Sequence, residues 1–167
     1  MTTLIVQAHP VEDSFNAAVF DAVRAELARH HDSVETVRIG QSGTLSADRF
    51  ESVDRLVTVY PTWYGSLPAR YLAAMADLVG PWVDSGEPHA TSPLRSVRSL
   101  KVVTTHGSSK LINVLQGEPG MQLWKRTVLP LCAPGATFAW KALYGIDLDK
   151  PAARSSFIDD AARFAAD

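Results

Sequence analysis

The sequence predicts an α/β fold in which a parallel sheet has helices on both faces. Short apolar segments alternate with segments of helical periodicity along the whole chain, which is typical of this class. The first apolar segment, residues 4–8, shows no alternation of apolar and polar residues, as expected for a strand buried on both faces. With 167 residues the chain has the length of one ordinary domain, so we expect residues 1–167 to form a single domain.

Five segments have the short, apolar character of strands. They are residues 4–8, 34–39, 55–60, 100–105 and 136–143. The second alternates apolar with polar residues, so we expect it to be more exposed than the others. Because crossovers between parallel strands are right-handed, few arrangements remain, and the five strands fit the three-layer flavodoxin-like fold with strand order 2-1-3-4-5.

Four helices are expected between and after these strands. They span residues 14–29, residues 67–78, part of 120–131, and the residues that begin at Pro151. Asp13 or Ser14 can cap the N-terminus of the first helix. Pro68 can begin the second, and Gly80-Pro81 is expected to end it.

Two connections, residues 81–99 and 107–120, are long for a compact domain, and such loops are more often functional or mobile. We expect the first to contribute to the rim of a site or to a dimer contact, with Trp82 and His89 as the candidate residues. A solvated connection is the alternative. A short helix is also expected around Phe50.

Composition and charge limit the class of protein. The 16 basic and 18 acidic residues give a net charge of −2, which provides no positive surface for nucleic acid. The single Cys132 excludes a disulfide framework and a thiolate zinc site, and we expect it to be a buried small hydrophobe and the chain to hold no metal. No apolar run reaches the ~18 residues of a membrane span, and no basic residue precedes the apolar N-terminal segment as in a secretory signal. We therefore expect a soluble, cytoplasmic protein.

Three polar or aromatic segments come directly after the first, third and fourth expected strands. They are residues 9–16, 61–65 and 104–109. Ligands of open parallel sheets bind outside the carboxyl ends of the strands, near the switch in strand order. We therefore expect these segments to converge on one site, and this convergence is the most informative feature of the sequence.

The first of these segments leads into a helix N-terminus, where free backbone N–H groups favour an anion such as phosphate. Ser14 and Asn16 can add donors, and His9 can add a donor or a positive charge. The chain has neither the glycine-rich fingerprint of dinucleotide-binding folds nor that of nucleoside triphosphatases. The alternative is that Ser14 only caps the helix and that His9 is an ordinary loop histidine.

Trp63 and Tyr64, in the second segment, can form the wall of a site for a planar ligand. The alternative is that they are core or dimer-interface residues. Residues 104–107 can present hydroxyls and backbone N–H groups to the polar edge of a ring, although by composition alone they are only a turn. Together the segments predict a ligand with a phosphate at one end and a flat ring with a polar edge at the other. A flavin has this shape.

Four motifs occur in order along the chain. They are Ala8-His9-Pro10 with Ser14-Phe15-Asn16, Tyr60-Pro61-Thr62-Trp63-Tyr64-Gly65 with Leu67-Pro68, Thr104-Thr105-His106-Gly107-Ser108, and Leu115-Gln116-Gly117. On these motifs the sequence resembles the flavodoxin-like NAD(P)H:quinone oxidoreductases. That family includes mammalian quinone reductase and the ancillary oxidoreductases of bacterial potassium-efflux systems.

The resemblance implies a set of residues that bind a flavin, either FMN or FAD. The phosphate end would be held by His9, Ser14, Phe15 and Asn16. The isoalloxazine would be held by Pro61, Thr62, Trp63, Tyr64, Gly65, Thr104, Thr105, His106, Gly107 and Ser108. The resemblance also implies a homodimer with each flavin at the subunit interface, NAD(P)H as co-substrate, and ping-pong transfer of a hydride through flavin N5 to a quinone or similar acceptor. In such enzymes the flavin carries the reaction and the protein tunes it.

The sequence departs from the family pattern in three places. His106 stands where the third motif usually has its first glycine, so it can either donate to the reduced flavin or crowd the pocket. Asn113 and Pro119 align with the tyrosine and histidine that assist hydride transfer in mammalian quinone reductase, and since neither can relay a proton we assign no catalytic residue. Residues 41–54, after the second strand, are shorter than in larger members, which leaves the choice between FMN and FAD open.

Two other functions remain open from the sequence. A regulatory or ancillary flavin-binding protein that docks to a partner would tolerate the loss of the relay residues. A one-electron flavodoxin-type carrier is less favoured, because such carriers are strongly acidic and the net charge here is only −2.

Overall fold

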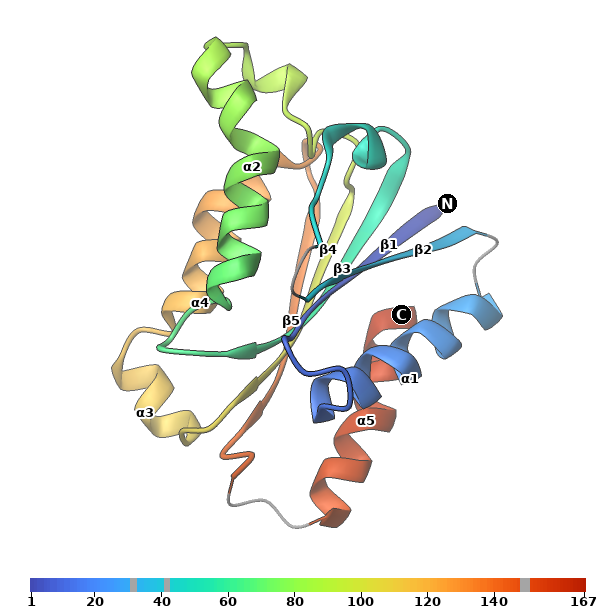
Figure 1. The fold of residues 1–167 in the computed structure, drawn as a ribbon, viewed down its shortest axis with the longest axis vertical. Coiled ribbons are helices and arrows are strands. Elements are labelled where there is room, and N and C mark those ends of the chain that lie inside the picture. Colours follow the sequence, from blue (N-terminus) through green and yellow to red (C-terminus); the bar gives the residue numbers. More distant parts are fainter. Residues whose placement is uncertain (31–32, 41–42, 148–150) are drawn as a thin grey trace.

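Five parallel strands form one sheet in the order β2-β1-β3-β4-β5 (Figure 1). The computed structural model describes residues 1–30, 33–40, 43–147 and 151–167. The strands are β1 (Thr2–Ala8), β2 (Ser33–Ile39), β3 (Val53–Thr62), β4 (Ser99–His106) and β5 (Thr137–Tyr144). Every neighbouring pair in the sheet is parallel. The predicted fold class and strand order are confirmed.

Helices form the two outer layers (Figure 1). One face of the sheet is covered by α1 (Phe15–His30) and α5 (Pro151–Ala166), and the other by α2 (Ala69–Ser85) and α4 (Pro119–Leu123). The shorter helical segments are η1 (Ala47–Phe50), η2 (His89–Thr91), α3 (Lys110–Leu115), η3 (Trp124–Val128) and η4 (Leu129–Leu131). Among the described residues, every helix is too short or too polar to cross a bilayer.

Burial of β1 on both faces explains its uninterrupted apolar sequence. Leu4 and Val6 pack on the side of α2, whereas Ile5 packs on the side of α1 and α5. The edge strand β2 is different, because it alternates exposed with buried residues in its second half. As expected, β2 has more exposed residues than any other strand, although β5, at the opposite edge, has no buried residue.

Local predictions for helix ends and loops are mostly confirmed. Ser14 caps α1, since its Oγ accepts a hydrogen bond from the backbone N of Ala17 at 3.2 Å. The short helix around Phe50 is η1. Cys132 is buried, and burial raises the pKa of its thiol to about 11. Of the polar stretch 41–54, residues 41–42 lie outside the described residues.

The prediction that Gly80-Pro81 ends the second helix is wrong, because α2 continues to Ser85. A proline inside a helix removes one backbone hydrogen bond, and side-chain contacts support the extra turn here. Trp82 Nε1 donates to Thr91 Oγ1 at 3.2 Å, and the Trp82 ring packs edge-on against His89 with centroids 6.1 Å apart. Much of the expected loop 81–99 is therefore held in place.

The expected connection 107–120 also contains a helix, α3. The helix is capped by Ser109, whose Oγ accepts a hydrogen bond from the backbone N of Ile112 at 3.4 Å. Helical periodicity did not indicate α3, because most of its apolar residues are exposed and do not form one buried face.

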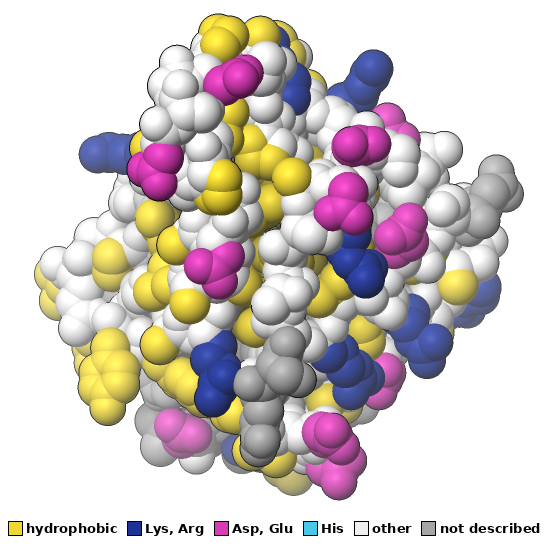
Figure 2. Space-filling model, turned by 45° about the horizontal axis from the view of Figure 1, so that its top comes forward, with side chains coloured by type: hydrophobic (Ala, Val, Ile, Leu, Met, Phe, Trp, Pro, Cys, Tyr) yellow, Lys and Arg dark blue, Asp and Glu magenta, His cyan; other side chains and the backbone are white. Residues whose placement is uncertain are grey.

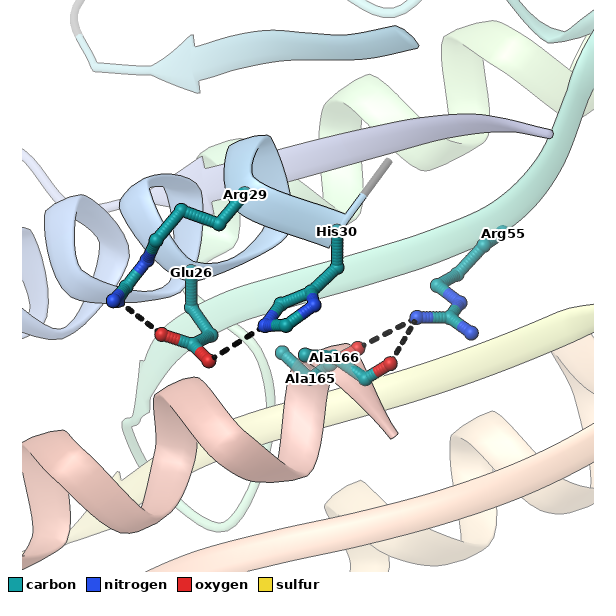
Figure 3. Close-up of polar contacts among 6 residues, drawn as sticks. All are labelled: Glu26, Arg29, His30, Arg55, Ala165 and Ala166. Carbon is teal, nitrogen blue, oxygen red and sulfur yellow. Dashed lines mark hydrogen bonds and ion pairs between the residues drawn. The ribbon is translucent and has the colours of Figure 1, made fainter. Parts of the chain in front are cut away.

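Two buried cations of the sheet hold the end of α5, and Figure 3 shows one of them, Arg55. Arg55, on β3, donates through Nη1 to the carbonyl oxygens of Ala165 at 2.9 Å and Ala166 at 3.1 Å. Lys101, on β4, donates to the carbonyl oxygen of Phe164 at 2.8 Å. The last carbonyls of a helix have no partner within the helix, so these side chains satisfy them and match the negative end of its dipole.

We expect Arg55→Met to lower the free energy of unfolding by about 2 kcal/mol, because the last carbonyls of α5 lose a charged donor. Urea denaturation measures the change. Arg98→Met is the control, since Arg98 is largely exposed and lies 4.0 Å from Asp54 in a surface ion pair that contributes little. Equal stability of the two variants would contradict this role for Arg55.

Candidate functional site

A cavity of about 900 Å³ lies at the carboxyl ends of β3, β4 and β5. It is lined by residues 61–65, 105–108 and 146–147 together with Asn113, Gln116 and Pro119. The second and third segments singled out in the sequence therefore line one cavity. Its volume lies within the range of small-molecule and cofactor sites.

The turn that follows β3 presents two aromatic side chains at this cavity. The backbones of Trp63 and Ser66 exchange hydrogen bonds of 3.0 and 2.9 Å, and between them Tyr64 has φ 51° and Gly65 has φ 76°. Two central residues with positive φ are the mark of a tight primed turn, in which only glycine is free of strain. The strained Tyr64 is fully exposed, so its ring contributes no packing to the core.

Position 65 requires glycine for two reasons, its positive φ and its close approach to Pro119. A Cβ at this position would lie 3.0 Å from Cγ of Pro119, at the start of α4. The turn after β3 and the beginning of α4 are therefore in close contact at the wall of the cavity.

The floor of the cavity is built from threonine hydroxyls at the ends of the strands. Thr62 Oγ1 lies 2.9 Å from Thr104 Oγ1, and Thr104 itself is fully buried and does not line the cavity. Thr105 Oγ1 accepts a hydrogen bond of 3.1 Å from Nδ2 of Asn16, on α1. Asn16 Oδ1 is buried and has no partner among the described residues. Asn16 therefore connects the start of α1 to the cavity floor.

His106, the last residue of β4, lines the cavity with only 5% of its surface exposed. Its ring stacks on Tyr144, its register partner on β5, with centroids 4.6 Å apart and an interplanar angle of 16°. Burial lowers the pKa of His106, while the nearby side chain of Asn113 and the charge of Glu118 act in the opposite direction. Burial is the largest of these effects, so the pKa lies below that of an ordinary histidine and the neutral imidazole is favoured at neutral pH.

The first segment lies beside the cavity and not in its lining. Nδ1 of His9 accepts a 3.0 Å hydrogen bond from the backbone N of Val11, and its ring lies 5.8 Å from that of Trp63. Phe15 packs toward α5, with its ring 6.3 Å from that of Phe157. His9 and Trp63 also border a smaller hollow of about 440 Å³, so the segments after β1 and β3 are in contact.

Five lining residues were not assigned to the site from the sequence: Asn113, Gln116, Pro119, Ile146 and Asp147. The backbone N of Ile146 donates to the carbonyl of His106 at 3.0 Å, which fixes the segment after β5 beside the segment after β4. The positions of Ile146 and Asp147 in the chain could have indicated them, because they follow the fifth strand, whose carboxyl end lies at the same edge of the sheet. The candidate rim residues Trp82 and His89 do not line the cavity.

Comparison with known proteins is consistent with this architecture. Residues 1–123 match the sequence model of a family described by its flavodoxin-like fold. The chain belongs to this family. A search of the curated proteins gives no match to this flavodoxin-like protein.

Several solved structures are similar to this flavodoxin-like protein over nearly its whole length. The protein Smu.1420 of Streptococcus mutans UA159 is 19% identical, with 99% of each chain covered and a TM-score of 0.78. An NAD(P)H:quinone oxidoreductase from Methanothermobacter marburgensis is 18% identical, with 99% of this chain and 96% of that chain covered and a TM-score of 0.71. An FMN-dependent NADH-azoreductase from Bacillus anthracis, in complex with FMN, is 14% identical, with 99% and 100% covered and a TM-score of 0.72. At these identities the likeness establishes the fold.

The strained turn gives a test that is independent of any ligand. We expect Tyr64→Gly to be about 1 kcal/mol more stable than Tyr64→Ala, because both remove an exposed ring and only alanine keeps the strain of a positive φ. Thermal or urea denaturation measures the difference. If the alanine variant were as stable as the glycine variant, the strain at this turn would be absent.

Proposed function

We propose that this protein is a flavin-dependent NAD(P)H oxidoreductase that reduces quinones or similar small acceptors, with residues 1–167 as one flavin-binding domain. The observation that carries the proposal is the exposed pair Trp63 and Tyr64, held by a strained turn at the wall of a cavity of about 900 Å³. Backbone strain persists where function requires it, and exposed aromatic rings beside a cavity suit a planar ligand.

The residues of the cavity fit an isoalloxazine ring. Its lining combines an aromatic wall with hydroxyls and backbone groups of Thr105, Gly107 and Ser108, and no lysine or arginine lines it among the described residues. Such a lining matches a flat, neutral ring with a polar edge better than a charged ligand. Ser14, at the N-terminus of α1, is the residue that we assign to the phosphate end, because its hydroxyl lies where backbone N–H groups favour an anion.

When bound, the flavin would accept a hydride from NAD(P)H and deliver it to the acceptor. Trp63 and Tyr64 would bind and orient the ring. Thr105 and its neighbours would hold the polar edge, where donors stabilise the negative charge that reduction creates. Because one cavity would serve the nicotinamide and the acceptor in turn, we infer a ping-pong cycle.

The names of similar structures support the same reaction class. One similar protein is an NAD(P)H:quinone oxidoreductase, and another is an FMN-dependent NADH-azoreductase with FMN bound. We therefore propose FMN or FAD as the cofactor and NAD(P)H as the co-substrate. The cytoplasm, where NAD(P)H is available, is the compartment that we propose.

A homodimer with the flavin at the interface is part of this proposal. Four of the six residues of α3 are exposed apolar residues: Leu111, Ile112, Val114 and Leu115. Figure 2 shows hydrophobic side chains gathered on the left of the molecule, the side on which α2 and α3 lie in Figure 1. Exposed apolar surface of this kind marks interaction sites. The alternative, an ancillary protein that docks to a different partner with little turnover, is supported by the same surface.

Flavin binding is tested by the visible spectrum of the protein during titration with FMN and with FAD. We expect a bound flavin, and we expect Trp63→Ala to weaken its affinity about tenfold because one stacking wall is lost. Trp82→Ala is the matched control, since Trp82 does not line the cavity. A protein that stayed colourless with both flavins would overturn the proposal.

Steady-state oxidation of NAD(P)H with a simple quinone separates the enzyme from the ancillary protein. We expect turnover by the flavin-loaded protein, with the parallel double-reciprocal lines of a ping-pong cycle. Absence of turnover by flavin-loaded protein would favour the docking alternative.

The dimer is tested by light scattering coupled to gel filtration. We expect a mass of twice the 18.1 kDa of the chain, and a monomer when Leu111 and Leu115 are both replaced by aspartate, because charge is costly in an apolar interface. Ala28→Asp, at an exposed position of α1 on the opposite face, is the control and should stay dimeric. A monomeric wild-type protein would contradict the proposed dimer.

A further inference from the structure

One titratable group in the cavity is buried and incompletely bonded. His106 lies 5% exposed, and its Nδ1 has no hydrogen-bond partner among the described residues. Its Nε2 lies 3.5 Å from Thr62 Oγ1, at the limit of a hydrogen bond. A buried imidazole with an unsatisfied nitrogen is costly in a structural role, so its position in the wall of the cavity needs a different explanation.

The groups around His106 hold its ring, and one of them, Glu118, favours the protonated form. Tyr144, on β5, stacks on the imidazole and donates its hydroxyl to Glu118 Oε1 at 2.8 Å. Glu118, which precedes α4, lies close enough to favour the protonated imidazole. Asp147, after β5, lines the same cavity and lies against Gly107, where an added Cβ would meet its Oδ2 at 2.8 Å.

Near neutral pH, His106 can accept a proton, whereas Tyr144 cannot release its own. Burial and the hydrogen bond to Glu118 raise the pKa of Tyr144 to about 12, so its hydroxyl keeps its proton. Burial lowers the pKa of His106 from its ordinary value, which favours a neutral imidazole that is able to accept a proton. Negative charge that develops beside it would raise its pKa and draw a proton onto the ring.

Reduction of a quinone by NAD(P)H requires one proton in addition to the hydride. The nicotinamide supplies a hydride, which is two electrons and one proton, and the hydroquinone needs one further proton from solvent. A bound flavin that had been reduced in this way would add one negative charge to the cavity. We propose that His106 takes up the solvent proton at that stage and donates it to the acceptor oxygen when the hydride leaves, with Tyr144 and Glu118 as positioning residues.

This role rests on the proposed function, because it requires a flavin in the cavity. It explains the histidine at the position where the resembling family has a glycine, and it supplies a proton donor although Asn113 and Pro119 cannot relay a proton. Thr62, Tyr144 and Glu118 are the neighbours that would hold the imidazole in place during the transfer.

The first test follows the protonation of His106 by NMR of its imidazole nitrogens in FMN-loaded protein. We expect the pKa of His106 to rise by at least about one unit when the flavin is reduced anaerobically with dithionite. His30, an exposed residue of α1 away from the cavity, is the internal reference and should not shift. This test needs no variant, so a folding defect cannot obscure it.

The second test measures the dependence of the flavin midpoint potential on pH, over the interval between the pKa of His106 in the oxidised protein and its pKa in the reduced protein, both taken from the first test. Two electrons are accompanied by two protons if His106 takes one up, and by one if it does not. We therefore expect the slope of the potential against pH to fall by half in His106→Gln and to keep its full value in His30→Gln. In Glu118→Gln the charge that favours the protonated imidazole is lost, so we expect the slope to begin falling at a lower pH.

The outcomes separate this inference from the proposed function. If wild-type protein binds neither FMN nor FAD, both are overturned. If flavin binds and turnover is normal, but the pKa of His106 does not change on reduction and His106→Gln keeps the wild-type slope, only the role of His106 is overturned.

Discussion

Parallel pairing of β1 with both β2 and β3 decides where a ligand can bind in this protein. From β1 the chain enters α1 on one face of the sheet, and from β3 it enters α2 on the other face (Figure 1). The connections after neighbouring strands therefore diverge, which leaves a crevice at their carboxyl ends. Strands β4 and β5 then bring residues 105–108 and 146–147 to the same edge.

Two residues at that edge have unfavourable local features. Tyr64 is held at a positive φ without packing its ring, and His106 is buried with a nitrogen unsatisfied among the described residues. The core on both faces of the sheet, with Leu4 on one side and Ile5 on the other, provides the stability that such costs require. Features of this kind are expected at a functional site.

The sequence was sufficient to predict the architecture because the strands alternate with amphipathic helices and because β1 is apolar on both faces. It was not sufficient at Pro81, where a tertiary contact of Trp82 with Thr91 supports one more turn of helix. It also missed α3, whose apolar residues are exposed and give no amphipathic signal.

The candidate site was predictable in part for the same reason. The segments after β3 and β4 were identified from their position, and the structure brings them together in one cavity. The stack of His106 on Tyr144 could not be predicted, because it depends on the register of β4 and β5, which pairs these two residues. Asp147 was not predicted, although it follows the fifth strand at the same edge of the sheet.

Flavin binding in the cavity is tested most directly by mapping the amide chemical shifts of isotope-labelled protein as FMN is added. If the cavity binds the flavin ring, the amides of residues 61–65 and 105–108 should change most. The polar hollow between the ends of α1 and α5, bordered by His30 and Arg163, should not change. Changes confined to that hollow, or no changes at saturating FMN, would contradict binding of the flavin ring in the cavity at the carboxyl ends of β3, β4 and β5.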